Sequence, residues 1–123
     1  MKRTDVVVIV PCYNEEQTIG EVVSAFRLEL PDATVYVYDN NSSDKSVRAA
    51  LTAGAVVRSV GPQGKGHVVR RAFADNDADV YVLVDGDGTY DAKTAPQMVS
   101  LVNEGGCDLV NATRAVANGY SRR

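Results

Sequence analysis

The sequence predicts an α/β fold, a three-layer α/β/α sandwich built on a mostly parallel sheet. Two observations lead to this prediction. Short apolar runs of strand length alternate with amphipathic segments of helical period, and such alternation builds a parallel sheet with helices on both faces through right-handed crossovers. The chain has 123 residues, 45% of them hydrophobic, which is enough for the core of one domain but not of two.

Continuous apolar runs, or stretches rich in β-branched and aromatic residues, predict five strands. They are expected at residues 6–10, 34–38, 55–60, 80–84 and 107–111.

Four helices are expected between the strands. Asn14 is the predicted N-cap of the first helix, and Pro31 ends that helix. Ser43, with Ser42 and Asp44 beside it, is predicted to cap the second helix, and Gly54 ends that helix. The third and fourth helices are expected at residues 66–73 and 94–103. The residues expected to face the core are Ile19, Val22, Val23, Phe26 and Leu30, then Val47, Ala50 and Leu51, then Val68, Val69, Ala72 and Phe73.

Charge and cysteine content exclude several classes of protein. The formal net charge is −3 and the 13 basic residues are scattered, which argues against a nucleic-acid partner. The sequence shows neither a signal peptide nor a transmembrane segment, so we expect a cytoplasmic protein. Cys12 and Cys107 are not spaced as a metal site and are expected to be reduced thiols.

Polar loops follow the carboxyl ends of the predicted strands, at the edge where open α/β sheets bind their ligands. In the acidic loop, Asp85 and Asp87 point to the same side of an extended chain, while Gly86 and Gly88 leave the backbone bare. Two hard oxygen donors on one side suit a divalent cation, Mg²⁺ or Mn²⁺. Asp91 is expected to cap the following helix.

Common ligand-binding motifs do not account for these loops. Residues 11–15 lack the glycines of a dinucleotide fingerprint, and residues 61–66 are too short for a Walker loop. The acidic loop is no EF-hand, because Tyr90 stands where the sharp turn needs glycine. His67, the single histidine, is expected on a helix surface or in packing rather than in catalysis.

Four segments carry recognisable motifs: residues 8–15 (VIVPCYNE), 38–44 (YDNNSSD), 64–66 (GKG) and 85–91 (DGDGTYD, with a DxD motif). In this order and spacing they resemble the nucleotide-binding half of the inverting family 2 glycosyltransferases with the GT-A fold. The nearest likeness is to polyprenyl (dolichyl) phosphate mannosyl- and glucosyltransferases. The resemblance implies a Rossmann-like sheet and metal-dependent binding of a nucleoside diphosphate sugar, of the GDP-mannose or UDP-glucose type. It also implies transfer of the sugar with inversion, to an acceptor such as a polyprenyl phosphate.

The resemblance implies a role for particular side chains. They are Pro11, Tyr13 and Glu15 for the nucleoside, Asp39 and Asn40 for the base, Lys65 and Arg114 for the phosphates, Asp85 and Gly86 for the nucleotide, and Asp85 with Asp87 for the metal. The family more often has a second acid where this chain has Asn40, so the contact to the base differs at this position.

The resemblance assigns no general base in this chain, since family members usually carry it in a later, acceptor-binding part. We therefore expect residues 1–123 to form a single nucleotide-diphosphate-sugar-binding domain, truncated before that part and inactive alone. Apolar surface that the later part would cover predicts a homo-oligomer or limited solubility. A lipid-phosphate acceptor would place the protein at the cytoplasmic face of the membrane.

Two other classes stay open. A sugar nucleotidyltransferase has a similar sheet and a metal-binding acid, but it needs a Gly-rich, Arg-containing loop that residues 11–15 do not provide. A non-catalytic doubly wound nucleotide- or metal-binding domain, such as a signalling receiver, also gathers acids at strand ends. That class leaves Tyr13 and Lys65 without a role.

Overall fold

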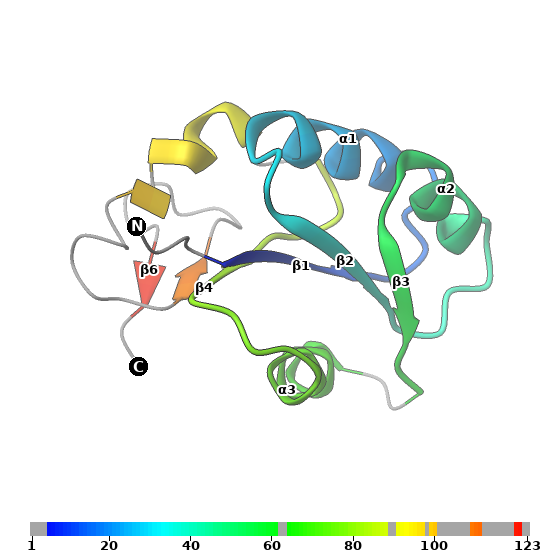
Figure 1. The fold of residues 1–123 in the computed structure, drawn as a ribbon. Helices are drawn as coiled ribbons and strands as arrows, with labels where there is room; N and C mark the ends of the chain where they lie inside the picture. Colours follow the sequence, from blue (N-terminus) through cyan, green and yellow to red (C-terminus); the bar gives the residue numbers. More distant parts are fainter. Residues whose placement is uncertain are drawn as a thin grey trace.

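The computed structural model describes residues 5–61, 64–88, 91–97, 99–100, 109–111 and 120–121, with Lys65 and the last two segments described by their backbone. The described strands form one sheet in the order β3-β2-β1-β4-β5-β6 (Figure 1). They are β1 (Val6–Cys12), β2 (Thr34–Asp39), β3 (Val56–Ser59), β4 (Val80–Leu83), β5 (Leu109–Asn111) and β6 (Tyr120–Ser121). Neighbouring strands are parallel, except that β6 pairs antiparallel with β5. The prediction of a mostly parallel sheet is confirmed, whereas β6, of 2 residues, is too short to show a period in the sequence.

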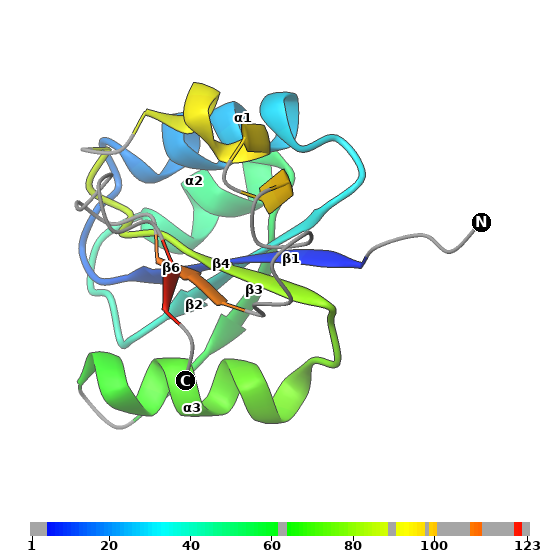
Figure 2. The same ribbon diagram turned by 90° about the vertical axis from the view of Figure 1, so that its left-hand side faces the viewer.

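Helices cover both faces of this sheet and make three layers (Figures 1 and 2). One face carries α1 (Ile19–Glu29), α2 (Ser46–Ala53) and the 3₁₀ turn η1 (Ala92–Thr94), which continues into helical residues 95–97 and 99–100. The other face carries α3 (Lys65–Asp75). The predicted α/β/α sandwich is therefore confirmed. The fourth helix begins slightly earlier than expected, and its predicted end at residues 101–103 lies outside the described residues.

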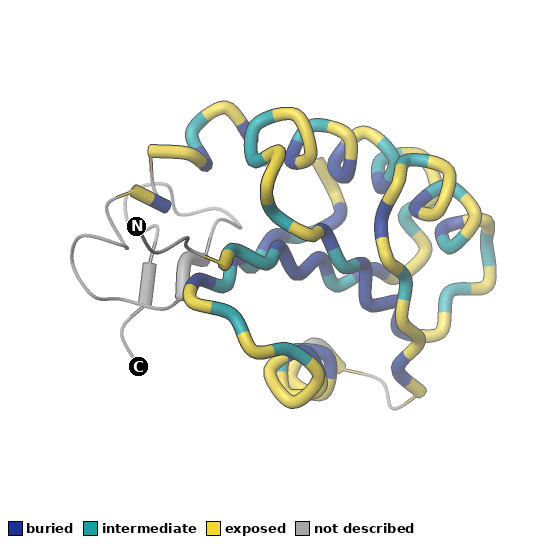
Figure 3. The backbone as a smooth tube through the Cα atoms, viewed as in Figure 1, coloured by how far each residue is buried: buried dark blue, intermediate teal, exposed yellow. Residues whose placement is uncertain are grey.

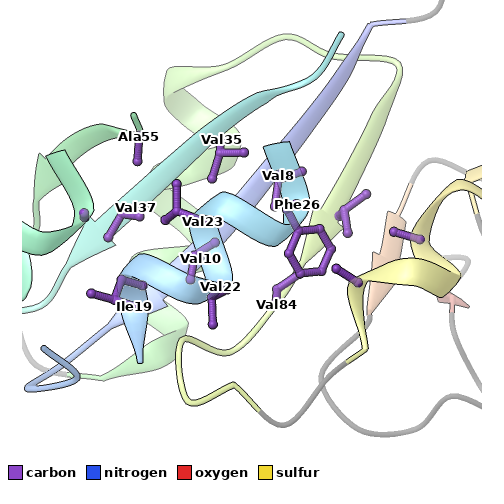
Figure 4. Close-up of a cluster of buried hydrophobic side chains, with 14 of the residues drawn as sticks. Val8, Val10, Ile19, Val22, Val23, Phe26, Val35, Val37, Ala55 and Val84 are labelled. Carbon is purple, nitrogen blue, oxygen red and sulfur yellow. The ribbon is translucent and has the colours of Figure 1, made fainter. Parts of the chain in front are cut away.

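The alternation of side chains along the strands divides the core into two clusters, one on each face of the sheet. Val8 and Val10 pack with Phe26 and the rest of the inner face of α1 (Figure 4). Ile9, which lies between the two valines, packs instead against Val68 of α3. The burial pattern along the chain shows the central strands enclosed between the two helical layers (Figure 3). The same alternation decides which way the side chains at the strand ends face.

The predicted N-caps of the first two helices were wrong. Thr18 stands at the N-cap of α1 and makes no side-chain capping bond. Asn14 has a left-handed backbone with φ 51°, and its Oδ1 accepts a hydrogen bond from the backbone N–H of Ser43 at 2.8 Å. At α2, Lys45 stands at the N-cap and makes no side-chain capping bond, while Oδ1 of Asp44, the residue before it, accepts the N–H of Ser46 at 3.0 Å. Both errors arose because polar side chains in these loops bond to the neighbouring loop.

The predicted inward faces hold for α1 and only in part for α2 and α3. All of the residues predicted for α1 are buried except Leu30, which is partly buried. Leu51 is 55% exposed because α2 lies beside β3, the outermost strand, and no further described element covers its outer side. Phe73 is 41% exposed and covers only part of its ring by packing edge-on against Tyr81, with 4.7 Å between ring centroids. Among the described residues, no helix has the length and apolar character needed to span a membrane.

Candidate functional site

The polar loops meet around a small cavity at the carboxyl ends of the central strands. The cavity measures about 200 Å³ and is lined by Pro11, Cys12, Tyr13, Glu15, Asn40, Val68 and Asp85. These residues come from the ends of β1, β2 and β4 and from the first turns of α3. A larger cavity of about 280 Å³ lies beside α1 and η1, but most of its lining comes from the side of α1 rather than from strand ends. Because open α/β sheets bind ligands beyond their strand ends, the smaller cavity marks the candidate site.

Asp39 is the most constrained acid of the site. It ends β2 with only 4% of its surface exposed, and its Oδ2 accepts the backbone N–H of Ser42 at 3.0 Å. Its Oδ1 is buried and accepts no hydrogen bond from any described residue. A buried acceptor without a partner costs about 1–3 kcal/mol. Asp39 itself is not among the residues that line the cavity, whereas the next residue, Asn40, is.

Asn40, the next residue, uses its amide to hold backbone. Its Nδ2 donates to the carbonyl of Val60 at 2.8 Å, and its Oδ1 accepts the N–H of Gly64 at 2.9 Å. Its own backbone N–H donates to the carbonyl of Cys12 at 2.8 Å. Asn40 is 7% exposed and thus joins the ends of β1, β2 and β3.

The loop after β1 is fastened to the loop after β2 by side-chain to backbone bonds. The N–H of Asn14 donates to the Ser42 hydroxyl oxygen at 2.8 Å, and the N–H of Glu15 donates to the Ser46 hydroxyl oxygen at 2.8 Å. Tyr13, which precedes them, is left 53% exposed beside the cavity. The fastening gives the loop of Tyr13 and Glu15 a defined place next to Asp39.

The same loop also contacts the acidic loop after β4. The hydroxyl of Thr18 donates to the carbonyl of Gly86 at 2.7 Å. A Cβ atom on Gly86 would lie 2.7 Å from Oε1 of Glu15 and 3.1 Å from Cδ1 of Ile19. Glycine at position 86 therefore lets the Glu15 carboxylate approach the backbone of the acidic loop. This close approach is a reason for glycine between Asp85 and Asp87.

The acidic loop turns instead of running straight. Residues 86–87 form a turn, so the loop does not have the extended backbone that was expected. Asp85 is half-buried and lines the cavity, and Asp87 is exposed. The part of the chain that the structure describes contains no group of three or more His, Cys, Asp or Glu side chains suited to a metal. The N–H of Lys93 donates to Oδ1 of Asp91 at 3.0 Å, which confirms that Asp91 caps the following helix.

Burial or hydrogen bonding shifts the pKa of two groups near the ends of β1 and β2. Burial raises the pKa of the Cys12 thiol from its ordinary 9.0 to about 11, so Cys12 is the inert buried thiol that was predicted. The Ser46 hydroxyl donates a hydrogen bond to Asp44 and lowers the pKa of that carboxyl group. Neither group has the properties of a nucleophile or a proton donor at neutral pH.

The remaining predicted residues lie at the margin of the site or outside the described part. Lys65 is the first residue of α3, directly after the N-cap Gly64. Its side chain, Arg114 and Cys107 lie outside the described residues. His67 is exposed on α3, in line with the expected surface position.

Several contributors to the site were not predicted. Val68 and Cys12 line the cavity, and Ser42, Ser46 and Thr18 fasten its loops. Val68 could have been found, since it lies on the inward face of a helix that begins at the carboxyl edge. The hydroxyl contacts join residues far apart in the chain, for which a single sequence carries no periodic signal.

Comparisons with known proteins agree on one family. The model of the family described as glycosyl transferase family 2 matches residues 7–123. The chain is 48% identical over 110 residues to protein RfbJ of Shigella flexneri, covering 89% of this chain and 85% of RfbJ. It is 34% identical over 110 residues to the dolichyl-phosphate hexose transferase of Haloferax volcanii, covering 89% of this chain but 48% of that protein.

Solved structures show the same fold. Glucosyl-3-phosphoglycerate synthase from Mycobacterium tuberculosis superposes with a TM-score of 0.71 and 27% sequence identity. The match covers 80% of this chain and 39% of that protein, which has been crystallised with Mg²⁺ and UDP and with Mn²⁺ and UDP-glucose. The chain thus spans less than half the length of this protein and of the Haloferax transferase.

Proposed function

Because the chain belongs to glycosyl transferase family 2, we propose that it binds a nucleoside diphosphate sugar through a divalent cation and serves as the donor-binding part of a glycosyltransferase. Residues 1–123 would form a single domain for this purpose. The proposed binding site lies at the carboxyl edge of the sheet, where the loops after β1, β2 and β4 converge on one cavity.

The buried oxygen of Asp39 is the observation that carries the proposal. Oδ1 of Asp39 is an ionisable acceptor with no described partner, at the edge of the sheet where ligands bind. Uracil offers a ring N3–H and guanine a ring N1–H, and either group would supply the donor that this oxygen lacks. Recognition through a buried polar group is selective, because a base without that donor would leave the acceptor unpaired.

The nucleoside would lie between the exposed ring of Tyr13 and the fastened loop after β1. Tyr13 offers an aromatic face on which a base or ribose can pack. Pro11 and Glu15 line the same cavity. The Glu15 carboxylate lies close to Gly86, where a side chain would leave no room for it. This arrangement is consistent with the roles that the family resemblance implies for all four residues.

The chemistry of the donor set fits Mg²⁺ or Mn²⁺. Asp85 lines the cavity and Asp87 follows it on the exposed side of the turn, and the described residues offer no group of three or more such ligands. A hard cation that keeps several waters and binds through one or two carboxylates plus substrate phosphates suits such a sparse site. When bound, the cation would stabilise the negative charge that grows on the departing nucleoside diphosphate. Lys65 and Arg114 are the residues that the family resemblance assigns to the phosphates, and Lys65 opens the N-terminal turn of α3.

The finer description of the substrates rests on the relatives. UDP-glucose is favoured over GDP-mannose as the donor, since the solved relative was crystallised with UDP and UDP-glucose. A polyprenyl phosphate acceptor, and with it a place at the cytoplasmic face of the membrane, is supported by the dolichyl-phosphate hexose transferase relative. Transfer would proceed with inversion, and a phosphate acceptor that is already ionised needs little help from a general base. Exposed Leu28, Leu51 and Val56 support self-association of the chain.

Calorimetric titration of the wild type and the Asp39→Asn variant with UDP and with GDP, in the presence of Mn²⁺, tests the proposal. We expect one nucleotide to bind and the variant to weaken it about tenfold or more, because an amide nitrogen would then face the donor of the base. Asp32→Asn is the matched control, since it removes the same charge from an exposed turn before β2. Failure of the folded wild type to bind either nucleotide would contradict the proposal, and tighter binding of UTP than UDP would favour a nucleotidyltransferase.

A further inference from the structure

The side chain of Thr18 joins the start of α1 to the acidic loop after β4. Its hydroxyl donates a hydrogen bond to the carbonyl oxygen of Gly86 at 2.7 Å, between residues that lie 68 positions apart in the chain. Its methyl group reaches Gly88, since a Cβ atom on that residue would lie 3.8 Å from Cγ2 of Thr18. The two branches of the Thr18 side chain thus reach the residues before and after Asp87.

Thr18 does not use its hydroxyl to cap its own helix. It stands at the N-cap of α1, where a threonine hydroxyl ordinarily accepts an N–H group of the first helical turn. No such capping bond forms here. The first turn is closed by the backbone, with the N–H of Val22 donating to the carbonyl of Thr18 at 3.1 Å. The hydroxyl therefore serves the acidic loop and not the helix.

Buried residues surround the hydrogen bond between Thr18 and Gly86. Ile19, the residue after Thr18, is fully buried and belongs to the same core cluster as Val84, which leads into the acidic loop. Gly86 is buried too, and a Cβ atom on it would lie 3.1 Å from Cδ1 of Ile19. The turn of the acidic loop is therefore fixed against the core by packing and by one side-chain hydrogen bond.

We infer that Thr18 is a positioning residue, which holds the turn of the acidic loop so that Asp87 meets the cation without reordering of the loop. This inference rests on the proposed function, in which Asp87 holds the metal. A loop that is already ordered binds its ligand more tightly than one that must be ordered on binding. Thr18 does not line the cavity, so its effect reaches the nucleotide through the acidic loop and appears when the cation is present.

Calorimetric titrations with UDP, with and without Mn²⁺, separate this role from a general loss of structure. Thr18→Val replaces the hydroxyl by a methyl group and keeps the shape of the side chain. In this variant we expect the affinity for UDP with Mn²⁺ to fall about fivefold or more, as the loss of one hydrogen bond predicts. Without Mn²⁺ the affinity should change less than about twofold. GDP replaces UDP if GDP is the ligand.

Two further variants complete the comparison. Thr18→Ser keeps the hydroxyl and should restore the affinity with Mn²⁺ to within about twofold of wild type. Thr52→Val makes the same exchange as Thr18→Val at an exposed position of α2 and should leave both affinities within about twofold of wild type. Equal losses with and without Mn²⁺ in Thr18→Val, no loss in that variant, or no rescue in Thr18→Ser would overturn the inference.

The carbonyl carbon resonance of Gly86 tests the contact without any ligand. A hydrogen bond to a carbonyl oxygen draws electron density from the carbon, so loss of the bond should move this resonance upfield. We expect the upfield shift in Thr18→Val, and the wild-type position in Thr18→Ser and Thr52→Val. A wild type that binds a nucleotide with Mn²⁺, but whose Gly86 resonance does not move in Thr18→Val, would overturn the inference alone. A wild type that shows the contact but binds no nucleotide with Mn²⁺ would reject the proposed function.

Discussion

Replacement of Gly64 by alanine should destabilise the protein. Gly64 has φ 117° and ψ 133°, and the atom nearest to an added Cβ is 3.5 Å away, so the penalty comes from the backbone and not from a clash. Holding a residue with a side chain in such a conformation costs about 1–3 kcal/mol. Alanine also reduces the freedom of the unfolded chain, which returns about 0.4–1 kcal/mol. The net loss of unfolding free energy should therefore be about 1–2 kcal/mol.

Gly66→Ala is the matched control, because Gly66 lies inside α3, has ordinary backbone and has no atom within 4 Å of an added Cβ. That variant should gain about 1 kcal/mol from helix propensity. Urea unfolding monitored by circular dichroism should move the two midpoints in opposite directions, with unchanged slopes. Equal shifts of the two variants in the same direction would refute the assigned conformation of Gly64.

Three further changes test the core, the buried thiol and the fastening of the loops. Phe26→Ala should cost about 3–5 kcal/mol of unfolding free energy in urea, against about 0.5 kcal/mol for Leu28→Ala, because their exposures are 1% and 77%. Because burial raises the pKa of Cys12 from 9.0 to about 11, stability should fall between pH 9 and 11, and less so in Cys12→Ala. Asn14→Ala should cost about 1 kcal/mol more than Asn41→Ala, since both positions have positive φ but the Asn14 side chain also accepts a backbone N–H. Equal losses of unfolding free energy for Phe26→Ala and Leu28→Ala, or for Asn14→Ala and Asn41→Ala, would contradict the burial or the hydrogen bond in question. Parallel pH profiles of stability for the wild type and Cys12→Ala would contradict the raised pKa of the thiol.

The sequence was sufficient to predict the layers and the parallel sheet because strand and helix periods are local. Val8 and Val10 on one face and Ile9 on the other follow directly from a strand buried on both sides. The exposure of Leu51 could not be predicted, since its helical period matches that of a buried face. Its position beside the outermost strand depends on the order of the strands, which the period of a single helix does not contain.

The candidate site was predictable as a place but not as a set of contacts. The rule that ligands bind beyond strand ends placed Tyr13, Glu15 and Asp85 around one cavity, and the structure brings them together. The cap predicted at Asn14 was wrong because the same side chain can bond locally or across to another loop. Asn14 bonds to the other loop because the fold brings the loops after β1 and β2 together.

The most direct test of metal-dependent donor binding is calorimetric titration with UDP and with GDP, each with and without Mn²⁺, in the wild type and in Asp87→Asn. We predict that Mn²⁺ strengthens the binding of one nucleotide about tenfold or more in the wild type, and that Asp87→Asn removes this dependence. Asp77→Asn, an exposed acid after α3, should retain it. Nucleotide binding that is equally tight without the metal, or unchanged in Asp87→Asn, would contradict the assignment of the acidic loop.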